Sequence, residues 1–233
     1  MKIGLLGDIH GNYRALEAVL SAADRFGVEL LLLTGDLVGY YDSPLAVLKM
    51  LNVWSYHMVR GNHEDMLKKA RYDDLFLAEV DAKYGKGLRS AIEQLSDEQI
   101  NILCNLPHPL YLEIDTCRVL LCHGSPWDIN QYVYPDAESE LLEKCGEQKY
   151  DLVVLGHTHY PMVHSVGKTL IVNPGSVGQP RNGKHGAQWA IFDTTTRQVE
   201  FHSQYYDTAD LVYECKKRNP DLPYLVDVLK RLN

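Results

Sequence analysis

The first sixty residues alternate between short apolar runs and segments with helical spacing, and this alternation strongly constrains the fold. The apolar runs occupy residues 2–6, 29–33 and 54–59. Between them, residues 12–26 and 43–51 carry apolar side chains at helical intervals, and Ser43 and Pro44 supply an N-cap and a first-turn proline for the second helix. This β-α-β-α-β order predicts parallel strands in a sheet that helices cover.

The rest of the chain predicts further helices and then strands linked mostly by hairpins. Residues 64–105 have helical spacing, and Ser96 with Gln99 forms a capping box. The later elements that we expect are strands 109–114 and 118–122 around Asp115-Thr116, a helix over 136–145 ended by Gly146, strands 151–155, 162–166, 169–173, 188–193 and 198–206, and one or two helices over 207–233 broken at Asn219-Pro220. This order predicts an α/β fold in one domain, residues 1–233, with two facing sheets and helices outside.

Composition argues against several classes of function. A net charge of −8 disfavours nonspecific binding to nucleic acid, which needs a basic surface. No apolar run approaches the roughly 18 residues of a membrane span, and Asp8 interrupts the first apolar stretch too early for a secretory signal. The five cysteines are odd in number and form no CxxC pair, which favours reduced thiols and a cytoplasmic location.

Several apolar runs end in glycine-marked turns that carry polar residues. The turns read GDIHGN, TGDLVGY, RGNHED, CHGSP and GHTHYP, and they hold five of the ten histidines. Parallel strands deliver their carboxyl ends to one edge, where open α/β sheets keep their sites, so we expect these side chains to gather there. The glycines suit tight turns and a close approach of the backbone to an ion or a phosphate.

His157 and His159 stand two positions apart, directly after the buried run 151–155. On a helix they would point about 200° apart, whereas in an extended segment they share a face and reach one site. Taken alone, the pair is typical of a polar loop. Asp8 and His10 repeat the same spacing after the first apolar run, which favours a shared site.

These turns supply enough donors for more than one metal ion. The seven candidates are Asp8, His10, Asp36, Asn62, His123, His157 and His159. Carboxylate, imidazole and amide donors without a thiolate suit manganese, with iron, nickel, cobalt or zinc as alternatives, in a catalytic site. Seven donors exceed the needs of one tetrahedral ion, whereas two ions about 3.5–4 Å apart around a bridging carboxylate would use them all. Such a site would be net positive and could hold a phosphate.

The motifs GDIHGN, GDLVG, GNHE, CHG and GHTH, in this order and spacing across residues 7–160, resemble those of the calcineurin-like metallophosphoesterase family. The stretch IVNPGSVGQPR at 171–181 resembles a small bacterial and archaeal branch of the family. The resemblance implies a four-layered αββα fold, in which two facing mixed sheets are flanked by helices, and phosphate-ester hydrolysis at two metal ions.

The resemblance also implies a role for each motif residue. Asp8, His10, Asp36 and His159 would hold one ion, and Asp36, Asn62, His123 and His157 would hold the other, with Asp36 bridging. His63 would lie beside the metals and assist the leaving group, although a histidine there can also serve only to bind a carboxylate behind the ligands.

One position departs from the family pattern. Gly39 stands where many relatives have an aspartate that orients the catalytic histidine, which leaves the partner of His63 open between Glu64 and Asp65. Tyr40 and the residue after it replace an arginine of the protein-phosphatase branch, which makes protein phosphatase activity the weaker expectation.

Other polar residues have local or structural interpretations. Asn12 is expected to cap the first helix. Arg181 and Arg60 are candidates to bind a phosphate through a planar guanidinium, although surface salt bridges are the commoner use of arginine. Ser176 and the amides of NPGSVG would shape the rim of the site. We expect structural or solvated roles for His57, His108, His164 and His202, and a surface-loop position for His185.

The residues and the resemblance together predict a dinuclear metal-dependent phosphodiesterase for a small phosphate ester or nucleotide. A metal-bound hydroxide would attack in line, and His63 would protonate the leaving group. The alternatives are a dinucleoside polyphosphate hydrolase of the diadenosine tetraphosphate type, a non-catalytic metal-binding scaffold and a single-zinc hydrolase. The short helical middle segment predicts an open site.

Overall fold

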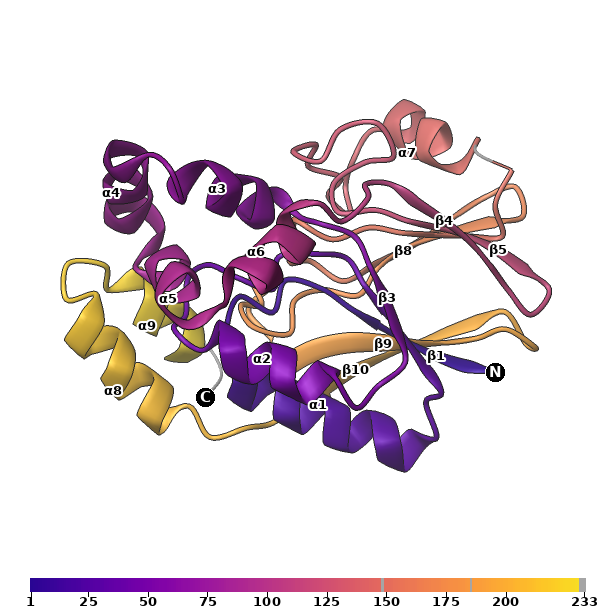
Figure 1. Ribbon diagram of the computed structural model, residues 1–233. Helices are drawn as coiled ribbons and strands as arrows, with labels where there is room; N and C mark the ends of the chain where they lie inside the picture. The colour runs from indigo at the N-terminus through magenta and orange to yellow at the C-terminus, as the bar shows by residue number, and fades with distance from the viewer. Residues whose placement is uncertain (148, 185, 231–233) are drawn as a thin grey trace.

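The computed structural model of the protein describes residues 1–147, 149–184 and 186–230, and it contains two five-stranded sheets (Figure 1). The first sheet has the order β10-β9-β1-β2-β3. Its strands are β1 (Lys2–Leu6), β2 (Leu30–Leu33), β3 (Tyr56–Met58), β9 (Ala187–Asp193) and β10 (Gln198–Gln204). Strands β1, β2 and β3 are parallel, as the alternating pattern predicts, and β9 and β10 add an antiparallel hairpin.

The second sheet has the order β4-β5-β6-β8-β7. Its strands are β4 (Leu110–Ile114), β5 (Cys117–Leu121), β6 (Leu152–Val154), β7 (Met162–Val166) and β8 (Thr169–Asn173). Strands β5, β6 and β8 are parallel at the centre, and β4 and β7 are antiparallel edges. Each sheet therefore contributes three parallel strands whose carboxyl ends carry the polar turns.

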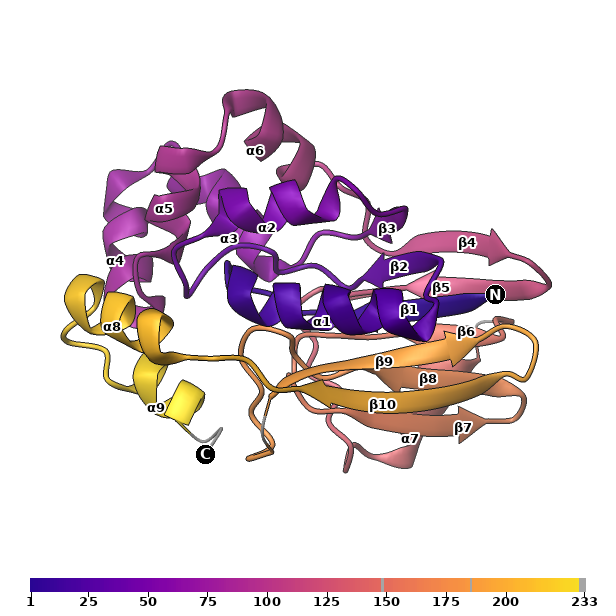
Figure 2. The ribbon, with the colours of Figure 1, turned by 90° about the horizontal axis from the view of Figure 1, so that it is seen from below.

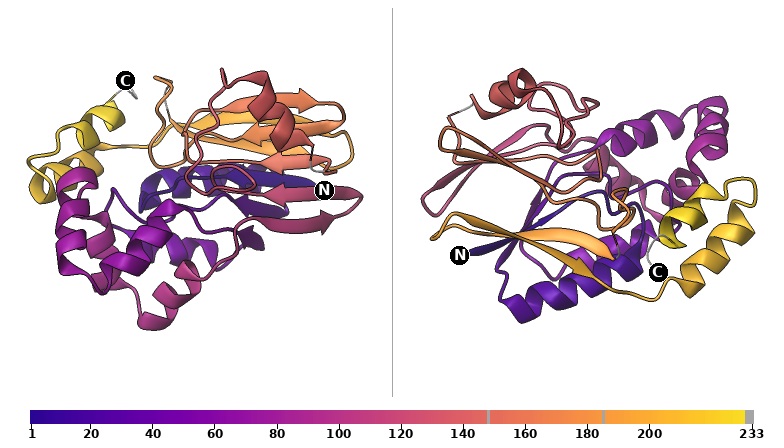
Figure 3. Two further views of the ribbon diagram at one scale, coloured as in Figure 1. Left: turned by 90° about the horizontal axis from the view of Figure 1, so that it is seen from above. Right: turned by 180° about the vertical axis from the view of Figure 1, so that it is seen from behind.

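Helices cover the outer faces of both sheets. They are α1 (Tyr13–Phe26), α2 (Pro44–Leu51), α3 (Asn62–Ala70), α4 (Asp74–Tyr84), α5 (Gly87–Gln94), α6 (Asp97–Cys104), α7 (Ser139–Gly146), α8 (Ala209–Arg218) and α9 (Tyr224–Lys230). Figure 1 shows α1 and α2 below the first sheet and α7 above the second. Figure 3 shows α8 and α9 beside α4 and α5, and the Tyr224 hydroxyl donates to the Lys83 carbonyl there.

The core follows these layers. One buried cluster joins side chains of both sheets, such as Ile3 and Phe192 from the first and Val119 and Val154 from the second. A second cluster packs most of the helices on the first sheet, and a third packs α7 on the second. Figure 1 shows the two sheets stacked, with α1 and α7 on opposite sides, and Figure 2, seen from below, shows α1 in front of the strands. This arrangement confirms the expected four-layered αββα fold.

Two local predictions at helix starts are wrong. The helix expected from residue 136 begins at Ser139 and includes Gly146, because Pro135 forms a turn in which the Ala137 amide donates to the Tyr134 carbonyl. The side chain of Ser43 makes no capping bond, although Pro44 does occupy the first turn of α2.

Other local predictions are confirmed. The side chain of Asn12 accepts a hydrogen bond from Ala15 at the start of α1, and Ser96 and Gln99 form the capping box of α6. In the part of the chain that the structure describes, no helix has the length and apolarity of a membrane span. His185 and residues 231–233 of the predicted C-terminal helix lie outside the described residues.

Candidate metal centre

The turns after the parallel strands meet where the two sheets lie against each other, and backbone hydrogen bonds connect them. The His10 amide donates to the Asp36 carbonyl, which joins the turns after β1 and β2. The Gly156 amide donates to the His123 carbonyl, and the Gly178 amide donates to the Asp8 carbonyl. The last bond crosses from one sheet to the other, so both sheets position a single cluster of side chains.

The backbone at this cluster is strained. Five predicted ligands have left-handed backbone angles, with φ between 52° and 67°: Asp8, His10, Asp36, His157 and His159. A side chain in that region costs about 1–3 kcal/mol and persists only where surrounding contacts hold it, and such residues cluster at functional sites. The expectation that 157–159 is extended is therefore wrong, because the turn itself, and not a strand register, directs both rings into the cluster.

Backbone carbonyls fix the orientation of three histidine rings. The Nδ1 atom of His10 lies 3.0 Å from the Val38 carbonyl oxygen, and that of His123 lies 2.8 Å from the Thr34 oxygen. The Nδ1 atom of His159 lies 2.7 Å from the Gln179 oxygen. Since a carbonyl can only accept, each Nδ1 carries a proton, and each neutral ring presents its Nε2 lone pair to the cluster. This is the usual second bond of a metal-binding histidine.

In the first group of donor atoms, formed by Asp8, His10 and His159, the nitrogen lone pairs of the two histidines point toward each other. The Nε2 atoms of His10 and His159 are 3.2 Å apart, and the Nε2 atom of His159 is 3.3 Å from an oxygen of Asp8. All three side chains are buried. Two neutral imidazoles repel each other in this arrangement, so the site requires a positive charge between them.

The second group, formed by Asn62, His123 and His157, also brings donor atoms close together without a cation between them. The Nε2 atom of His123 lies 2.9 Å from the Asn62 side-chain oxygen and 3.1 Å from Nδ1 of His157. Burial lowers the pKa of His123 to about 3, and burial lowers the pKa of His157 to about 4. Both rings are therefore neutral near pH 7 and able to donate a lone pair.

Asp36 lies between the two groups. Its Oδ1 atom accepts the His63 amide at the start of α3 at 2.8 Å. Its Oδ2 atom lies 3.5 Å from Nε2 of His123 and 3.8 Å from Nε2 of His10. Burial raises the pKa of Asp36 well above its usual value, and the charges of Glu64 and Asp8 add to this effect. A cation at Oδ2 would reverse that shift.

The donor chemistry fits metal ions. Three sets of donor atoms lie close enough to hold an ion: Asp8 with His10 and His159; His10 with Asp36 and His63; and Asp36 with His123 and His157. Burial opposes ionisation of Asp8, but the attraction and hydrogen bond of His159, together with the attraction of His123 and His157, lower the pKa of Asp8 to about 2. The structure thus brings together all seven predicted donors, of which the carboxylates and imidazoles fall into these sets.

The ring of His63 lies beside the cluster among other rings. Its centroid is 4.7 Å from that of His10, 4.9 Å from that of Tyr40 and 5.7 Å from that of Tyr84. Its Nε2 atom is 4.0 Å from Oδ2 of Asp36. Burial lowers the pKa of His63 well below its usual value, with repulsion from His123 adding to the effect.

The departure at Gly39 has a steric consequence. A Cβ atom at Gly39 would lie 2.1 Å from Nδ1 of His63, so an aspartate side chain cannot occupy this position while His63 keeps its place. Among the described atoms, none hydrogen-bonds to that Nδ1. Aromatic packing, and not a carboxylate, holds the ring.

Neither acidic residue after His63 replaces the missing aspartate. The carboxylate of Glu64 accepts backbone N–H groups of Gly61, Asp36 and Leu37 at 2.7–2.9 Å, which ties α3 to the turn after β2. Asp65 instead accepts from Arg60 at 2.9 Å. The possibility that one of them orients His63 is wrong.

The two candidate arginines differ in position. The guanidinium of Arg181 lies at the site, where it donates to the Tyr40 hydroxyl and to Oε1 of Gln179, each at 3.0 Å. Arg60 is bound elsewhere: its Nε donates to Asp65, and its Nη1 donates to the Leu106 carbonyl. The structure therefore does not bring Arg60 to the predicted phosphate position.

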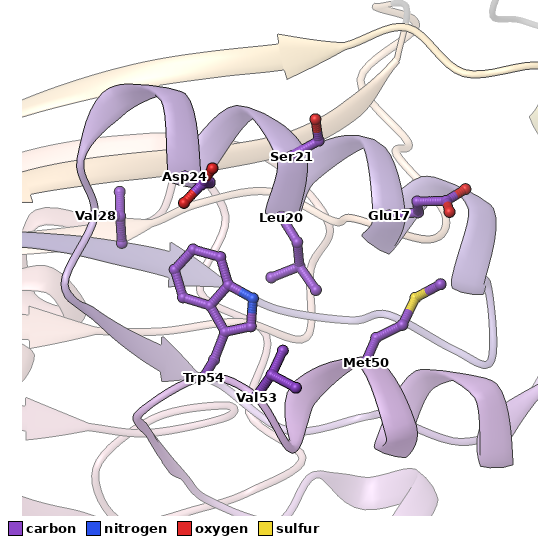
Figure 4. A pocket seen from close by; sticks show the side chains of 8 residues that line it. All are labelled: Glu17, Leu20, Ser21, Asp24, Val28, Met50, Val53 and Trp54. Carbon is purple, nitrogen blue, oxygen red and sulfur yellow. The ribbon is translucent and has the colours of Figure 1, made fainter.

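A cavity of about 40 Å³ opens on the cluster. Its lining residues are Asp36, Tyr40, Asn62, His63, Tyr84, Tyr132, His157, His159 and Arg181. Such a volume holds one or two small species, so most of a substrate must lie outside it. A larger hollow of about 570 Å³ lies between α1 and α2, away from the histidines, and Figure 4 shows Trp54, Leu20 and Met50 along it.

Sequence patterns missed several residues at the site. Tyr84 ends a helix and Tyr132 lies in an irregular segment, so no local signal connects either to the cluster. Ser176 is expected at the rim of the site, but its buried hydroxyl donates to the Asp8 carbonyl at 2.7 Å and accepts the Gln179 amide at 2.8 Å. The first of these bonds connects the turn after β8 to the turn after β1.

A comparison with protein families identifies the chain. Residues 1–197 match the model of the calcineurin-like phosphoesterase superfamily domain. The chain belongs to this superfamily. This confirms the family expected from the motifs, and the matched region contains every predicted donor, together with His63 and Arg181.

Individual proteins resemble the chain along most of its length. A solved metallophosphoesterase from Sphaerobacter thermophilus has a TM-score of 0.79 and 29% identity, with 100% of this chain and 99% of that one covered. Serine/threonine-protein phosphatase 2 of Escherichia coli is 27% identical, covering 78% of this chain and 89% of that protein. Phosphodiesterase YfcE of Escherichia coli is 25% identical, covering 85% and 91%.

Proposed function

We propose that this phosphoesterase is a phosphodiesterase that works with two divalent metal ions, of which manganese is the first candidate. The observation that carries the proposal is the opposed pair of Nε2 atoms in His10 and His159, 3.2 Å apart beside a buried carboxylate. A second group around His123 has the same need for a cation, and Asp36 lies between the two.

The free thiols of the five buried cysteines support a reducing, cytoplasmic location.

The two ions would have separate sets of ligands. Asp8, His10 and His159 would hold one, Asn62, His123 and His157 would hold the other, and Asp36 would bridge them. Bound metal ions supply Lewis acidity toward the phosphate and lower the pKa of water at the site. The carbonyl groups behind His10, His123 and His159 keep the ligand nitrogens unprotonated and aimed at the ions.

Arg181 and His63 would act on the substrate. The half-buried guanidinium of Arg181 adds a positive charge at the cavity and can pair with a phosphate oxygen. Its hydrogen bonds to Tyr40 and Gln179 hold it in place. Burial lowers the pKa of His63, so the negative phosphate of the substrate would have to favour its protonated form. His63 would then give the proton on Nε2, which lies 4.0 Å from Oδ2 of Asp36, to the departing alkoxide.

A diester is favoured over a phosphoprotein by positions 39–41. Gly39 and Tyr40 replace the aspartate and the arginine expected in the protein-phosphatase branch, and His63 fills the space of that aspartate. The similarity to phosphodiesterase YfcE supports this choice, while the similarity to serine/threonine-protein phosphatase 2 defines the competing one. The complete donor set disfavours a non-catalytic scaffold.

A panel of substrates tests the proposal. Bis(4-nitrophenyl) phosphate, 4-nitrophenyl phosphate, a phosphoserine peptide and diadenosine tetraphosphate would each be assayed with Mn²⁺, Co²⁺, Ni²⁺, Zn²⁺ and Mg²⁺. We expect the diester to give the highest kcat/KM, with Mn²⁺ among the best ions. Equal rates on the peptide and the diester would contradict the phosphodiesterase assignment, and a preference for the tetraphosphate would favour the dinucleoside polyphosphate hydrolase.

A further inference from the structure

Two partly exposed tyrosines stand beside the metal centre, in the irregular segment between β5 and α7. Tyr132 is 47% exposed and Tyr134 is 39% exposed. Their rings are parallel, with an interplanar angle of 5° and centroids 5.6 Å apart. We call this pair the tyrosine platform. Large aromatic side chains that are exposed together next to a polar site are typical of binding surfaces.

The platform is anchored from below. Val133, between the two tyrosines, is buried in the cluster that packs α7 against the second sheet. Val133 is 2% exposed while its two neighbours are partly exposed, so burial of Val133 leaves both tyrosines on the outer side of the segment. A turn at Pro135 and the bonds between Ser125 and Asp128 close the two ends of the segment.

The platform adjoins the groups proposed to bind phosphate. The Tyr132 ring lies 4.2 Å from the ring of His157, with an angle of 32° between them. Tyr132 and Arg181 line the same cavity. The rings of Tyr134 and Tyr160 meet edge to face with centroids 5.6 Å apart, which places the platform next to the turn that carries His157 and His159.

We propose that the tyrosine platform binds the nucleobase of a nucleoside phosphodiester while its phosphate lies at the metal centre; this inference rests on the proposed function. The cavity holds little more than the reacting group, so the rest of the substrate must lie on the surface around it. Every nucleobase has a flat π-face that stacks on tyrosine, so the platform would accept different bases. A phenol hydroxyl at the end of each ring can hydrogen-bond to water or to a ribose.

Two substrates with one leaving group isolate the contribution of the nucleoside. Thymidine 5′-(4-nitrophenyl) phosphate and ethyl 4-nitrophenyl phosphate both release nitrophenolate, and they differ only in the group that stays on the phosphate. We expect the wild-type protein with Mn²⁺ to prefer the thymidine diester in kcat/KM. Base stacking on an aromatic side chain corresponds to a preference of about 5- to 150-fold.

Variants of the platform provide the direct test. Tyr134→Ala should lower kcat/KM on the thymidine diester toward that of the ethyl diester and leave the ethyl diester unchanged. Tyr132→Ala should act in the same direction, and Tyr134→Phe should keep the preference because the ring remains. Tyr205→Ala is the matched control, since Tyr205 is 79% exposed just past the end of β10 and should change neither substrate.

A binding measurement keeps the test independent of activity. In calorimetry with the Mn²⁺-loaded protein, we expect AMP to bind more tightly than ribose 5-phosphate. The Tyr134→Ala variant should remove this difference, and Tyr134→Phe should retain it.

The possible outcomes separate the two proposals. Two results would overturn the platform and leave the proposed phosphodiesterase function intact. One is equal kcat/KM of the wild-type enzyme on both diesters, and the other is an equal loss of kcat/KM on both diesters in the Tyr134→Ala variant. Hydrolysis of neither diester with any of the five metal ions overturns the proposed function. In that case the calorimetry still decides whether the platform binds a base.

Discussion

The carboxyl and amino ends of the parallel strands differ in backbone conformation and in the burial of charged side chains. At the carboxyl ends, five predicted ligands have left-handed backbone angles, and the carboxylates of Asp8 and Asp36 are buried. At the amino ends, only Asp115 and Arg197 among the described non-glycine residues have such angles, and both lie in exposed hairpin turns. Asp193 there accepts the amides of the turn that follows it. Strain and buried charge are therefore concentrated at the edge where we place the chemistry.

This contrast implies that substitutions at the carboxyl edge disturb metal binding, whereas equivalent ones at the amino edge do not. The largest effect is expected for Asp36→Asn. An amide cannot supply the second negative oxygen that faces His123 and His10, so both ions should bind weakly. We expect diester hydrolysis to fall by about 10³-fold, in line with the several kcal/mol that metal ions supply.

Metal titration with a chelator competition assay would check this expectation. His123→Ala should weaken mainly one of the two binding steps, because His123 lies in only one of the two proposed ligand sets. Asp193→Asn provides the control at the opposite edge and should leave both steps unchanged. Equal affinities for Asp36→Asn and the wild-type protein would exclude Asp36 as a shared ligand.

The next effect concerns His63, which touches the cluster through its ring. The His63→Asn variant should keep two-metal occupancy and lose about 10²–10⁴-fold in rate on a diester with a poor leaving group, the usual contribution of a positioned acid. Nitrophenolate needs little protonation, so a nitrophenyl diester should lose much less.

Steady-state kinetics on the two esters would distinguish the roles open to His63. A uniform loss would assign it to stabilising the phosphate, and an unchanged rate on both would remove it from the reaction. Because packing among Tyr40, Tyr84 and His10 holds the ring without a carboxylate, we expect the loss at the lower end of that range.

A smaller effect, on stability and not on chemistry, is expected for Glu64. Its carboxylate accepts the amides of Gly61, Asp36 and Leu37, and Glu64→Gln would turn an NH₂ group toward one of these donors. We expect a loss of about 2–3 kcal/mol in the free energy of unfolding, as for hydrogen bonds to a buried charged group. Urea denaturation would measure it, with Glu140→Gln on the exposed face of α7 as the control, and a loss no larger than the control would contradict this role.

The smallest effect is expected at the amino edge. Hydrogen bonds from Thr196 and Thr195 lower the pKa of Asp193, so its contribution to stability is present above the unfolded-state pKa of about 4 and is lost as pH falls through the folded-state value. The difference in Tm between the wild-type protein and Asp193→Asn should therefore shrink between pH 6 and pH 3. A difference in Tm that grows as the pH falls from 6 to 3 would contradict the lowered pKa of Asp193.

The sequence predicts the donors better than it predicts what holds them. Asp8, His10 and their counterparts follow apolar runs directly, so their convergence depends only on parallel strands and on turns that lie close by in the chain. Glu64 and Tyr132 act through contacts with residues distant in sequence, and no local pattern encodes these contacts. Arg60 has the chemistry of a phosphate ligand but pairs with Asp65, five residues on, which only the structure reveals.

The left-handed backbone of His157 and His159 had no signal either, because residues other than glycine rarely adopt it and the surrounding bonds impose it. The ends of α7 and the role of Ser43 were likewise decided by neighbouring residues and not by propensity. Periodicity therefore establishes the layers of the fold, and tertiary contacts establish the detailed geometry of the site.

The central claim is that the carboxyl edge of the two sheets holds two metal ions around Asp36. The most direct test is elemental analysis of the purified chain after saturation with Mn²⁺ and removal of free ions. We predict two ions per wild-type chain and two per chain for the Asp193→Asn control. One ion per chain in the saturated wild-type protein would contradict the dinuclear centre.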